Sequence, residues 1–468
     1  MTQTARATGS WRDLLGHHLG TCTVLAGGVA MYATNEFLTV SLLPSAIAEI
    51  GGSRLYAWVV TLYLVGSVAA ATTVNATLRQ FGARVSFLLG LSVFGVASLV
   101  CAVAPTMQVL IAGRTLQGVA GGLLAGLGYA LINAELPREL WTRGSALVSA
   151  MWGVATVVGP AIGGVFAQYG LWRWAFGTMT VLSVLMAALV TAVLGAERAV
   201  AAGEHSTRQV PVWSLLVIGA AALAVSVAQL PRNAAAIAGL VFLGLLLVAA
   251  FIAVDRRKQA KVLPPSVFGS GPLKWIYLTM AMLMMAVMVD TYVPLFGQRL
   301  GHLSPVGAGF LGASLAVGWT VSEVVSASLH NRRVIGYVVL VAPLLMGTGL
   351  AVGALTQSAD ASPSLVGLWA LALVIAGIGI GMAWPHMSVR AMESVDDPAE
   401  SSAAAAAINT VQLISGAFGA GIAGVVVNTA PGDAVIQARW LYAVFTVLAA
   451  VGVLAAYRAT RRDRRSLR

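Results

Sequence analysis

The sequence predicts an all-α membrane protein with fourteen transmembrane helices, and three observations support this fold class. The 468 residues are 58% hydrophobic and 10% charged and include 51 glycines, a composition unlike that of soluble globular proteins. Apolar runs of about 20 residues recur along the chain, each long enough to cross a hydrocarbon core of about 30 Å. The runs are too uniformly apolar for the alternating strands of an outer-membrane barrel, so helices are expected.

The predicted spans form two six-helix halves, residues 20–194 and 274–457. A polar tail (1–19) precedes the first half, linkers within 195–273 carry two extra spans, and a basic tail (458–468) follows the second half. In chain order, the expected spans are 20–43, 56–78, 85–105, 107–132, 146–168, 174–194, 213–230, 235–254, 274–296, 306–329, 334–356, 365–389, 401–427 and 439–457.

Basic residues indicate which side of the membrane each loop occupies. With the N-terminus inside, 22 Lys and Arg fall on the inner side and five on the outer side, and Arg114 lies within a span. This asymmetry predicts that both termini are cytoplasmic. Because the net charge of +11 is spread over short loops, it favours contact with membrane lipids and not with nucleic acid. The excess of arginine over lysine suits a GC-rich bacterial genome, so we expect a protein of a bacterial inner membrane. We also expect it to be a monomer.

Three carboxyl groups fall inside predicted spans: Glu36, which follows Asn35, then Asp290 and Glu323. An acid near the centre of a lipid-spanning helix costs about 2.5–3.5 kcal/mol on insertion scales, so such residues usually face the protein interior and serve a function. For Asp290 a structural hydrogen bond is the alternative. For Glu323 the alternative is pairing with a nearby base such as His330.

Arg114, Gln117 and Gly118 form the pattern Arg-x-x-Gln-Gly in span 107–132. This pattern resembles a motif of the major facilitator superfamily. In the family this arginine lies near the central cavity and is tied to proton transfer, and structural pairing with a carboxylate is the alternative. Span 146–168 resembles the antiporter motif of exporters through Gly153, Gly159, Pro160, Gly163 and Gly164, and glycine packing without directional meaning is the alternative.

The loop between the second and third spans matches the family pattern only in part. Gly82 and Arg84 fit, whereas Asn75 replaces the first glycine and Arg79 replaces the acidic residue. In the family that acid helps to latch the two halves together on the cytoplasmic side, so the latch is not expected here. The family's acid in the first span corresponds to Asn35, and Glu36 is turned about 100° from it around the helix.

The six plus two plus six layout resembles the fourteen-span drug:proton antiporter family of the major facilitator fold. The resemblance implies proton-coupled export of hydrophobic or amphipathic compounds, including cationic ones. The chain contains no nucleotide-binding loop of the Gly-x4-Gly-Lys-Ser/Thr type, no convincing metal cluster and no catalytic triad, so we expect no cofactor, no ATP drive and no enzyme. An exporter of a lipid, glycolipid or metabolite, and a non-transporting membrane receptor or scaffold, are the alternatives.

We expect proton coupling at Glu36, Asp290, Glu323 and Arg114. Methionines are flexible and suit surfaces that accept many apolar ligands, although they serve equally for packing. A histidine titrates near neutral pH, but a lone one near a helix end is more often a simple hydrogen-bonding residue. The residues expected to line the substrate cavity are Tyr32, Asn35, Gln117, Met284, Met288, Tyr292, Phe296, Trp384 and His386.

Overall fold

The computed structural model describes residues 11–71, 73–195, 211–258, 261–329, 331–395 and 398–465, and these residues form helices joined by short connections. Parts of the predicted tails and linkers (1–10, 196–210 and 466–468), together with His330, lie outside the described residues. The proposed pairing of Glu323 with His330 is therefore outside the described structure.

The first half contains α1 (Trp11–His17), α2 (Leu19–Ile50), η1 (Ser53–Leu55), α3 (Tyr56–Ala71), α4 (Val74–Ala102), α5 (Met107–Ala130), α6 (Ile132–Glu135), η2 (Arg138–Leu140), α7 (Trp141–Gln168) and α8 (Trp172–Val193). The middle segment contains α9 (Val212–Val227), α10 (Ala234–Arg257) and η3 (Pro265–Phe268). The second half contains α11 (Leu273–Val287), η4 (Met288–Tyr292), α12 (Val293–Gly301), α13 (Pro305–Ser326), α14 (Arg332–Thr356), α15 (Pro363–Glu393), α16 (Pro398–Thr429) and α17 (Ala434–Arg465).

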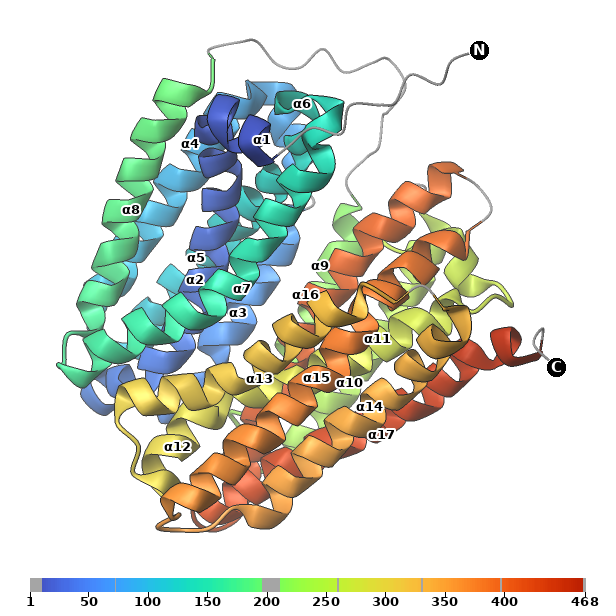
Figure 1. Ribbon diagram of the computed structural model, residues 1–468. Helices are drawn as coiled ribbons and strands as arrows, with labels where there is room; N and C mark the ends of the chain where they lie inside the picture. The colour runs from blue at the N-terminus through green and yellow to red at the C-terminus, as the bar shows by residue number, and fades with distance from the viewer. Residues whose placement is uncertain are drawn as a thin grey trace, which may run out of the picture.

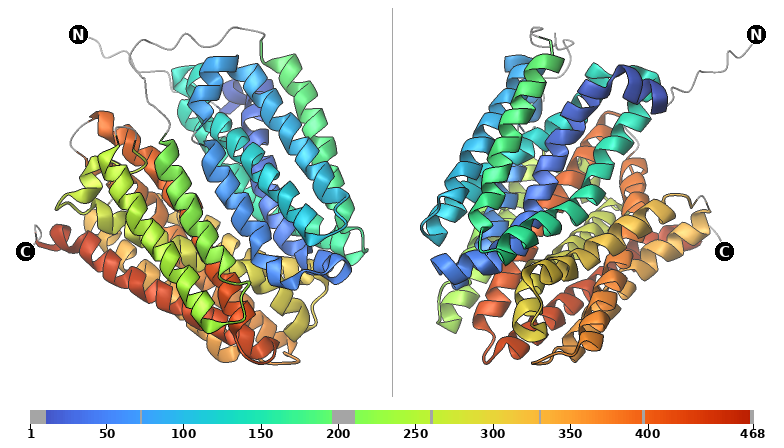
Figure 2. Two further views of the ribbon diagram at one scale, coloured as in Figure 1. Left: turned by 180° about the vertical axis from the view of Figure 1, so that it is seen from behind. Right: turned by 60° about the vertical axis from the view of Figure 1, so that its left-hand side comes forward.

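The two halves are separate helical bundles that meet at one end and diverge at the other (Figures 1 and 2). They diverge toward the end that carries α1 and α6, which we call the open end, and meet toward the end that carries α12, which we call the closed end. The halves are joined mainly by two helix pairs, α3 with α16 and α7 with α13, and α2 also packs on α13 and α12. The extra helices lie to one side of this junction, with α9 packed on α16, α3 and α10.

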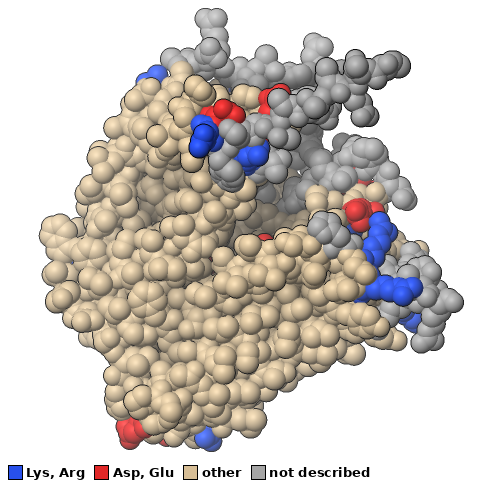
Figure 3. Space-filling model, in the orientation of Figure 1, with Lys and Arg blue, Asp and Glu red and all other residues tan. Residues whose placement is uncertain are grey.

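Twelve helical segments of the described chain are long and apolar enough to cross a membrane. They include α10, of whose apolar window only 11% is buried, as expected for a helix that faces lipid. On the face shown in Figure 3, charged side chains lie mostly near the ends of the molecule, and the belt between them is uncharged apart from an acid visible in the hollow. A helical multi-pass membrane protein is thus confirmed.

The predicted count of fourteen spans is not confirmed by this criterion. Helix α2 is 32 residues long, but polar side chains such as Asn35 and Glu36 lower its mean hydropathy. Helix α9 is apolar but has only 16 residues, which is short for a span of about 20 residues.

Two backbone irregularities position residues of interest. Gly82 has φ 76° and ψ 173°, so the helix labelled α4 is interrupted there and Arg84 lies on the new turn that follows. A positive φ of this kind is readily adopted by glycine alone. The predicted span 274–296 is likewise divided, because the 3₁₀ segment η4 separates α11 from α12 and carries Asp290.

Candidate functional site

A cavity of about 280 Å³ lies between the two halves, and we call it the central cavity. Figure 3 shows the molecular face hollowed between the halves. The first half contributes α2, α3, α5 and α7, and the second contributes α11, η4, α13, α15 and α16. Its lining residues are Glu36, Phe37, Leu64, Tyr129, Ser149, Trp152, Thr156, Met284, Val287, Met288, Asp290, Leu315, Ala316, Trp319, Thr320, Glu323, Trp384, Gln412 and Leu413.

A smaller cavity of about 20 Å³ adjoins the central cavity, and Glu36, Phe37, Met288 and Asp290 line both. A space of this size holds about one water molecule. Its remaining walls include Pro160 of the antiporter motif, together with residues of α13.

Glu36 and Asp290 come from opposite halves and line the same two cavities. Among the described residues neither carboxyl group forms an ion pair with Lys, Arg or His. An uncompensated carboxylate in such a site carries a large desolvation cost. The arrangement therefore leaves both carboxyl groups available to a proton or to a cationic ligand.

Glu323 lines the central cavity from α13, and its carboxylate accepts a hydrogen bond of 2.8 Å from Trp319 Nε1. The Trp319 ring in turn lies 5.6 Å from the Trp384 ring, centroid to centroid. Glu323 is therefore held by an aromatic wall of the cavity and does not face lipid as an isolated acid.

Arg114 lies outside the central cavity, in a buried polar network inside the first half. Its side chain is 1% exposed and donates a hydrogen bond of 2.9 Å to Gln117 Oε1. The guanidinium carbon lies 3.9 Å from the centre of the Tyr63 ring, a cation–π contact. Gln117 Nε2 donates to Ser98 Oγ at 2.8 Å. No carboxylate of the described chain forms an ion pair with Arg114, so the structural pairing considered for it is not observed.

Fewer of the predicted cavity residues line the central cavity than expected. Met284, Met288 and Trp384 do so, and Tyr292 lines a different cavity at the closed end. His386 is 7% exposed, and its Nε2 makes a 2.9 Å hydrogen bond with Ser326 Oγ. The predicted residues that are buried in helix packing and line none of these cavities are Tyr32, Asn35, Gln117, Phe296 and His386.

Several polar or aromatic residues of the cavity wall were not predicted, among them Tyr129, Ser149 and Trp152. A signal for two of them was present, because Ser149, Trp152 and Thr156 recur at helical spacing on one face of α7. Trp152 also packs edge-on against Tyr32, with ring centroids 5.6 Å apart.

The glycines of the antiporter motif let α7 approach two other helices closely. A Cβ atom added to Gly159 would lie 2.6 Å from Phe37 Cβ, and one added to Gly163 would collide with the Leu38 backbone, both on α2. A Cβ atom on Gly164 would lie 2.7 Å from Val306 Cα of α13, in the other half. Gly153 faces Thr320 of α13 in the same way, at 3.1 Å. The motif therefore packs within its own half and across the junction.

Comparisons with known proteins agree with this architecture. The family described as Major Facilitator Superfamily matches residues 25–420. A probable multidrug-efflux transporter of Mycobacterium tuberculosis (strain H37Rv) is 72% identical over 468 residues, which cover 99% of each chain. A multidrug transporter protein of Bacillus subtilis is 23% identical over 86% of this chain and 75% of its own. In fold, the inward-open xylose transporter from E. coli superposes with a TM-score of 0.62 at 13% identity, covering 94% of both chains.

Proposed function

We propose a function from one established premise: this chain belongs to the major facilitator superfamily. We infer that it is a multidrug-efflux transporter that exports hydrophobic or amphipathic small molecules, cations among them, in exchange for protons. The probable multidrug-efflux transporter that shares 72% of its residues supports this cargo class.

The observation that carries the proposal is the shared position of Glu36 and Asp290 on the central cavity without an ion pair. When either carboxyl group takes up a proton, its charge is removed and a bound cation loses its electrostatic partner. Competition between proton and cation for one carboxylate is the chemical basis of antiport. Glu323, on the same cavity, provides a third acid along a path through the second half.

The walls of the central cavity suit varied apolar ligands. Met284 and Met288 adapt their shape through several rotatable bonds, and Trp152, Trp319 and Trp384 offer flat apolar surfaces. Aromatic faces also attract cations, by about 0.5–2 kcal/mol. The same wall can therefore accept neutral and cationic compounds of different shapes.

Alternating access follows from the two-bundle architecture. The halves rock about the junction of α7 with α13 and α3 with α16, so that the central cavity opens first at one end and then at the other. One net charge moved across 100 mV supplies about 2.3 kcal/mol, which sustains a substrate gradient of tens-fold.

For the membrane arrangement, we propose fourteen spans, with α2 and α9 added to the twelve apolar segments. An even number puts both termini on one side, and the excess of basic residues makes that side the cytoplasm of a bacterial inner membrane. The open end would then face the cytoplasm, where an exporter takes up its cargo. One chain supplies the entire cavity, so a monomer suffices for transport.

Efflux from proteoliposomes under an imposed pH gradient tests the function. We expect wild-type transport to follow the gradient and to fall at least tenfold in Glu36→Gln and in Asp290→Asn. Glu139→Gln is the matched control, because this carboxyl group is exposed and lies outside the central cavity. Gradient-independent transport by the wild type would disprove proton coupling, and full activity of both cavity variants would disprove the site assignment.

A further inference from the structure

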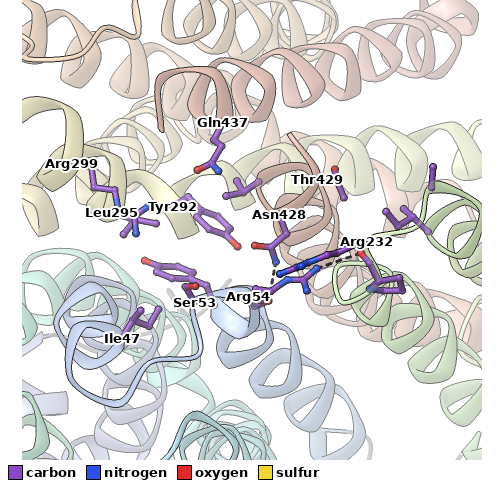
Figure 4. Close-up of a pocket in the computed structure, with 15 residues that line it drawn as sticks. Ile47, Ser53, Arg54, Arg232, Tyr292, Leu295, Arg299, Asn428, Thr429 and Gln437 are labelled. Carbon is purple, nitrogen blue, oxygen red and sulfur yellow. Dashed lines mark hydrogen bonds between the residues drawn. The ribbon is translucent and has the colours of Figure 1, made fainter. Parts of the chain in front are cut away.

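A second cavity, of about 570 Å³, lies at the closed end where three parts of the chain meet (Figure 4). We call it the arginine pocket, because Arg54 of η1, Arg232 of the α9–α10 connection and Arg299 of α12 line it. No Asp or Glu is among the described residues of its wall. Its volume falls within the range of about 300–1,000 Å³ that is usual for small-molecule sites.

The concentration of arginine here is unusual for this end of the molecule. Of the five basic residues predicted on the outer side, Arg173 pairs with Glu49 and Arg439 donates to the Gln357 carbonyl at 2.8 Å. The other three line the arginine pocket. Figure 4 shows Arg54 and Arg232 on one side of Tyr292 and Arg299 on the other.

None of these three guanidinium groups is neutralised by an acid of the described chain. Arg232 and Arg299 are exposed and make no ion pair or hydrogen bond with described residues. Arg54 reaches the carbonyls of Gln229 and Pro231 only at 3.5 and 3.4 Å. The pocket therefore holds a surplus of positive charge that its own wall does not use.

Two stacked tyrosines form part of the wall of the same space. Tyr56 and Tyr292 stack with their ring centroids 4.5 Å apart, and each is 1% exposed. Both line the arginine pocket. Their stacked rings therefore give the pocket an aromatic wall that spans the junction of the two halves.

The pocket wall is fixed by contacts between separate parts of the chain. Asn428 of α16 donates to the Arg54 carbonyl at 2.8 Å and to Gln229 Oε1 at 3.2 Å. Trp58 Nε1 of α3 donates to the Ser226 carbonyl of α9 at 2.9 Å. The first half, the extra helices and the second half are therefore held together at this point.

We propose that the arginine pocket binds a phosphate-bearing anion and that the occupant holds the two halves together at the closed end. Guanidinium groups match the geometry and charge of phosphate oxygens. Because Arg54 belongs to the first half and Arg299 to the second, opening of this end separates the ligand's partners. A ligand that binds only the closed arrangement shifts the population toward it.

Two sources can supply such an anion: the headgroup of a membrane phospholipid or a soluble phosphate. Purified protein is titrated with phosphatidylglycerol, with phosphatidylcholine as the lipid without net charge, and with inorganic phosphate, while its unfolding temperature is followed. We expect phosphatidylglycerol or inorganic phosphate to stabilise the protein, and the effective one identifies the source. Absence of stabilisation by both overturns the proposal.

The double variant Arg232→Gln/Arg299→Gln is expected to bind the effective anion at least tenfold more weakly. Arg439→Gln is the control for loss of an arginine at the same end of the molecule, because Arg439 lies outside the pocket and donates to Gln357. Unchanged affinity in the double variant, or an equal loss in the control, rules out this site.

The clamping role is tested by measuring the distance between the two halves at the closed end. This measurement uses no substrate and no pH gradient, so its result does not depend on the transport proposal. Spin labels are placed at Tyr169→Cys and Leu355→Cys, which are 72% and 80% exposed and belong to different halves. Serines replace Cys22 and Cys101 in this background. We expect the anion to shift the distribution of distances between the two labels toward shorter distances in the protein with an intact arginine pocket. We expect no such shift in the double variant. A distribution that the anion leaves unchanged refutes the clamping role.

Discussion

Asn35 and Glu36 are neighbours in the chain, yet their side chains lie in different environments of α2. Asn35 is fully buried, and its Oδ1 accepts a hydrogen bond of 3.5 Å from Gln117 Nε2 of α5. Glu36 lines the central cavity and the small cavity beside it. The rotation of about 100° per residue in an α-helix separates the two side chains and leaves the acid facing the junction of the halves.

This difference predicts opposite phenotypes for two adjacent substitutions. Glu36→Gln removes a titratable group from a cavity wall, so we expect at least a tenfold loss of gradient-driven efflux with little change in unfolding temperature. Asn35→Ala removes a buried hydrogen bond, so we expect a loss of stability of about 1–3 kcal/mol with coupling retained. Transport and thermal unfolding of both variants are measured together, and the reverse pattern would contradict the assignment.

Glu323 predicts a change in selectivity. Its carboxylate lines the cavity beside Trp319 and Trp384, so it attracts cationic cargo more than neutral cargo. In Glu323→Gln we expect export of a cationic dye to fall about tenfold, equivalent to about 1.4 kcal/mol, while export of a neutral compound is retained. Competitive efflux of the two compounds from the same vesicles measures the ratio. Trp319→Phe, which removes the N–H donor but keeps the carboxyl group and an aromatic ring, is the control. An equal loss for both compounds in Glu323→Gln would refute the prediction.

The crossing of α7 and α13 predicts a conformational effect of Gly164→Ala. The added methyl group would lie 2.7 Å from Val306 Cα and 3.2 Å from the Pro305 carbonyl oxygen. Overpacking of this kind costs about 1–3 kcal/mol. Here it destabilises the contact between α7 and α13 that closes one end of the molecule. We therefore expect that end to open more often.

Thiol labelling measures this opening at Ser41→Cys, a buried position beside Gly309 of α13. In a background without Cys22 and Cys101, a membrane-impermeant reagent should label Ser41→Cys faster when Gly164→Ala is present. Gly239→Ala on α10 is the control, because no heavy atom lies within 4 Å of its added methyl group. Equal labelling rates with and without Gly164→Ala would show that the contact does not control closure.

Hydropathy predicted the helices well because lipid-facing and core-facing residues are both apolar over whole spans. It placed the end of the first span at residue 43, whereas α2 continues through Pro44 to Ile50.

The break at η4 has a local cause that was present in the sequence. Pro294 has no N–H to donate to the Asp290 carbonyl four residues earlier, and its ring clashes with that carbonyl in a regular helix.

The site itself was only partly predictable. Acids inside spans are recognisable because their insertion is costly, and Glu36, Asp290 and Glu323 all line one cavity. The other residues that face the cavity are determined by how the two halves pack against each other. This packing is a long-range property, and the hydrophobic periodicity of a single span does not reveal it. Tyr32, Asn35 and Gln117 are therefore buried between helices instead, and the cavity wall formed by Tyr129 and Trp152 was missed.

The last prediction concerns a contact at the closed end, beyond the predicted first span. Trp172 Nε1 donates a hydrogen bond of 2.6 Å to Glu49 Oε2, and Arg173 donates to Glu49 Oε1 and to the Ala104 carbonyl. The hydrogen bonds from Trp172 and then from Arg173 hold the pKa of Glu49 below its ordinary value. Because the folded-state pKa is the lower one, this contact stabilises the fold above the unfolded-state pKa of about 4.3.

The stabilisation is lost as the pH falls from about 4.3 through the folded-state pKa, where the carboxylate of Glu49 takes up a proton. Glu49→Gln should therefore have a lower unfolding temperature than the wild type at pH 7, and the difference should shrink toward pH 3. Glu139→Gln, at an exposed carboxyl group outside this contact, should show no such convergence. A difference between Glu49→Gln and the wild type that stays constant over this range would mean that the ionised carboxylate is not what joins α2 to α8.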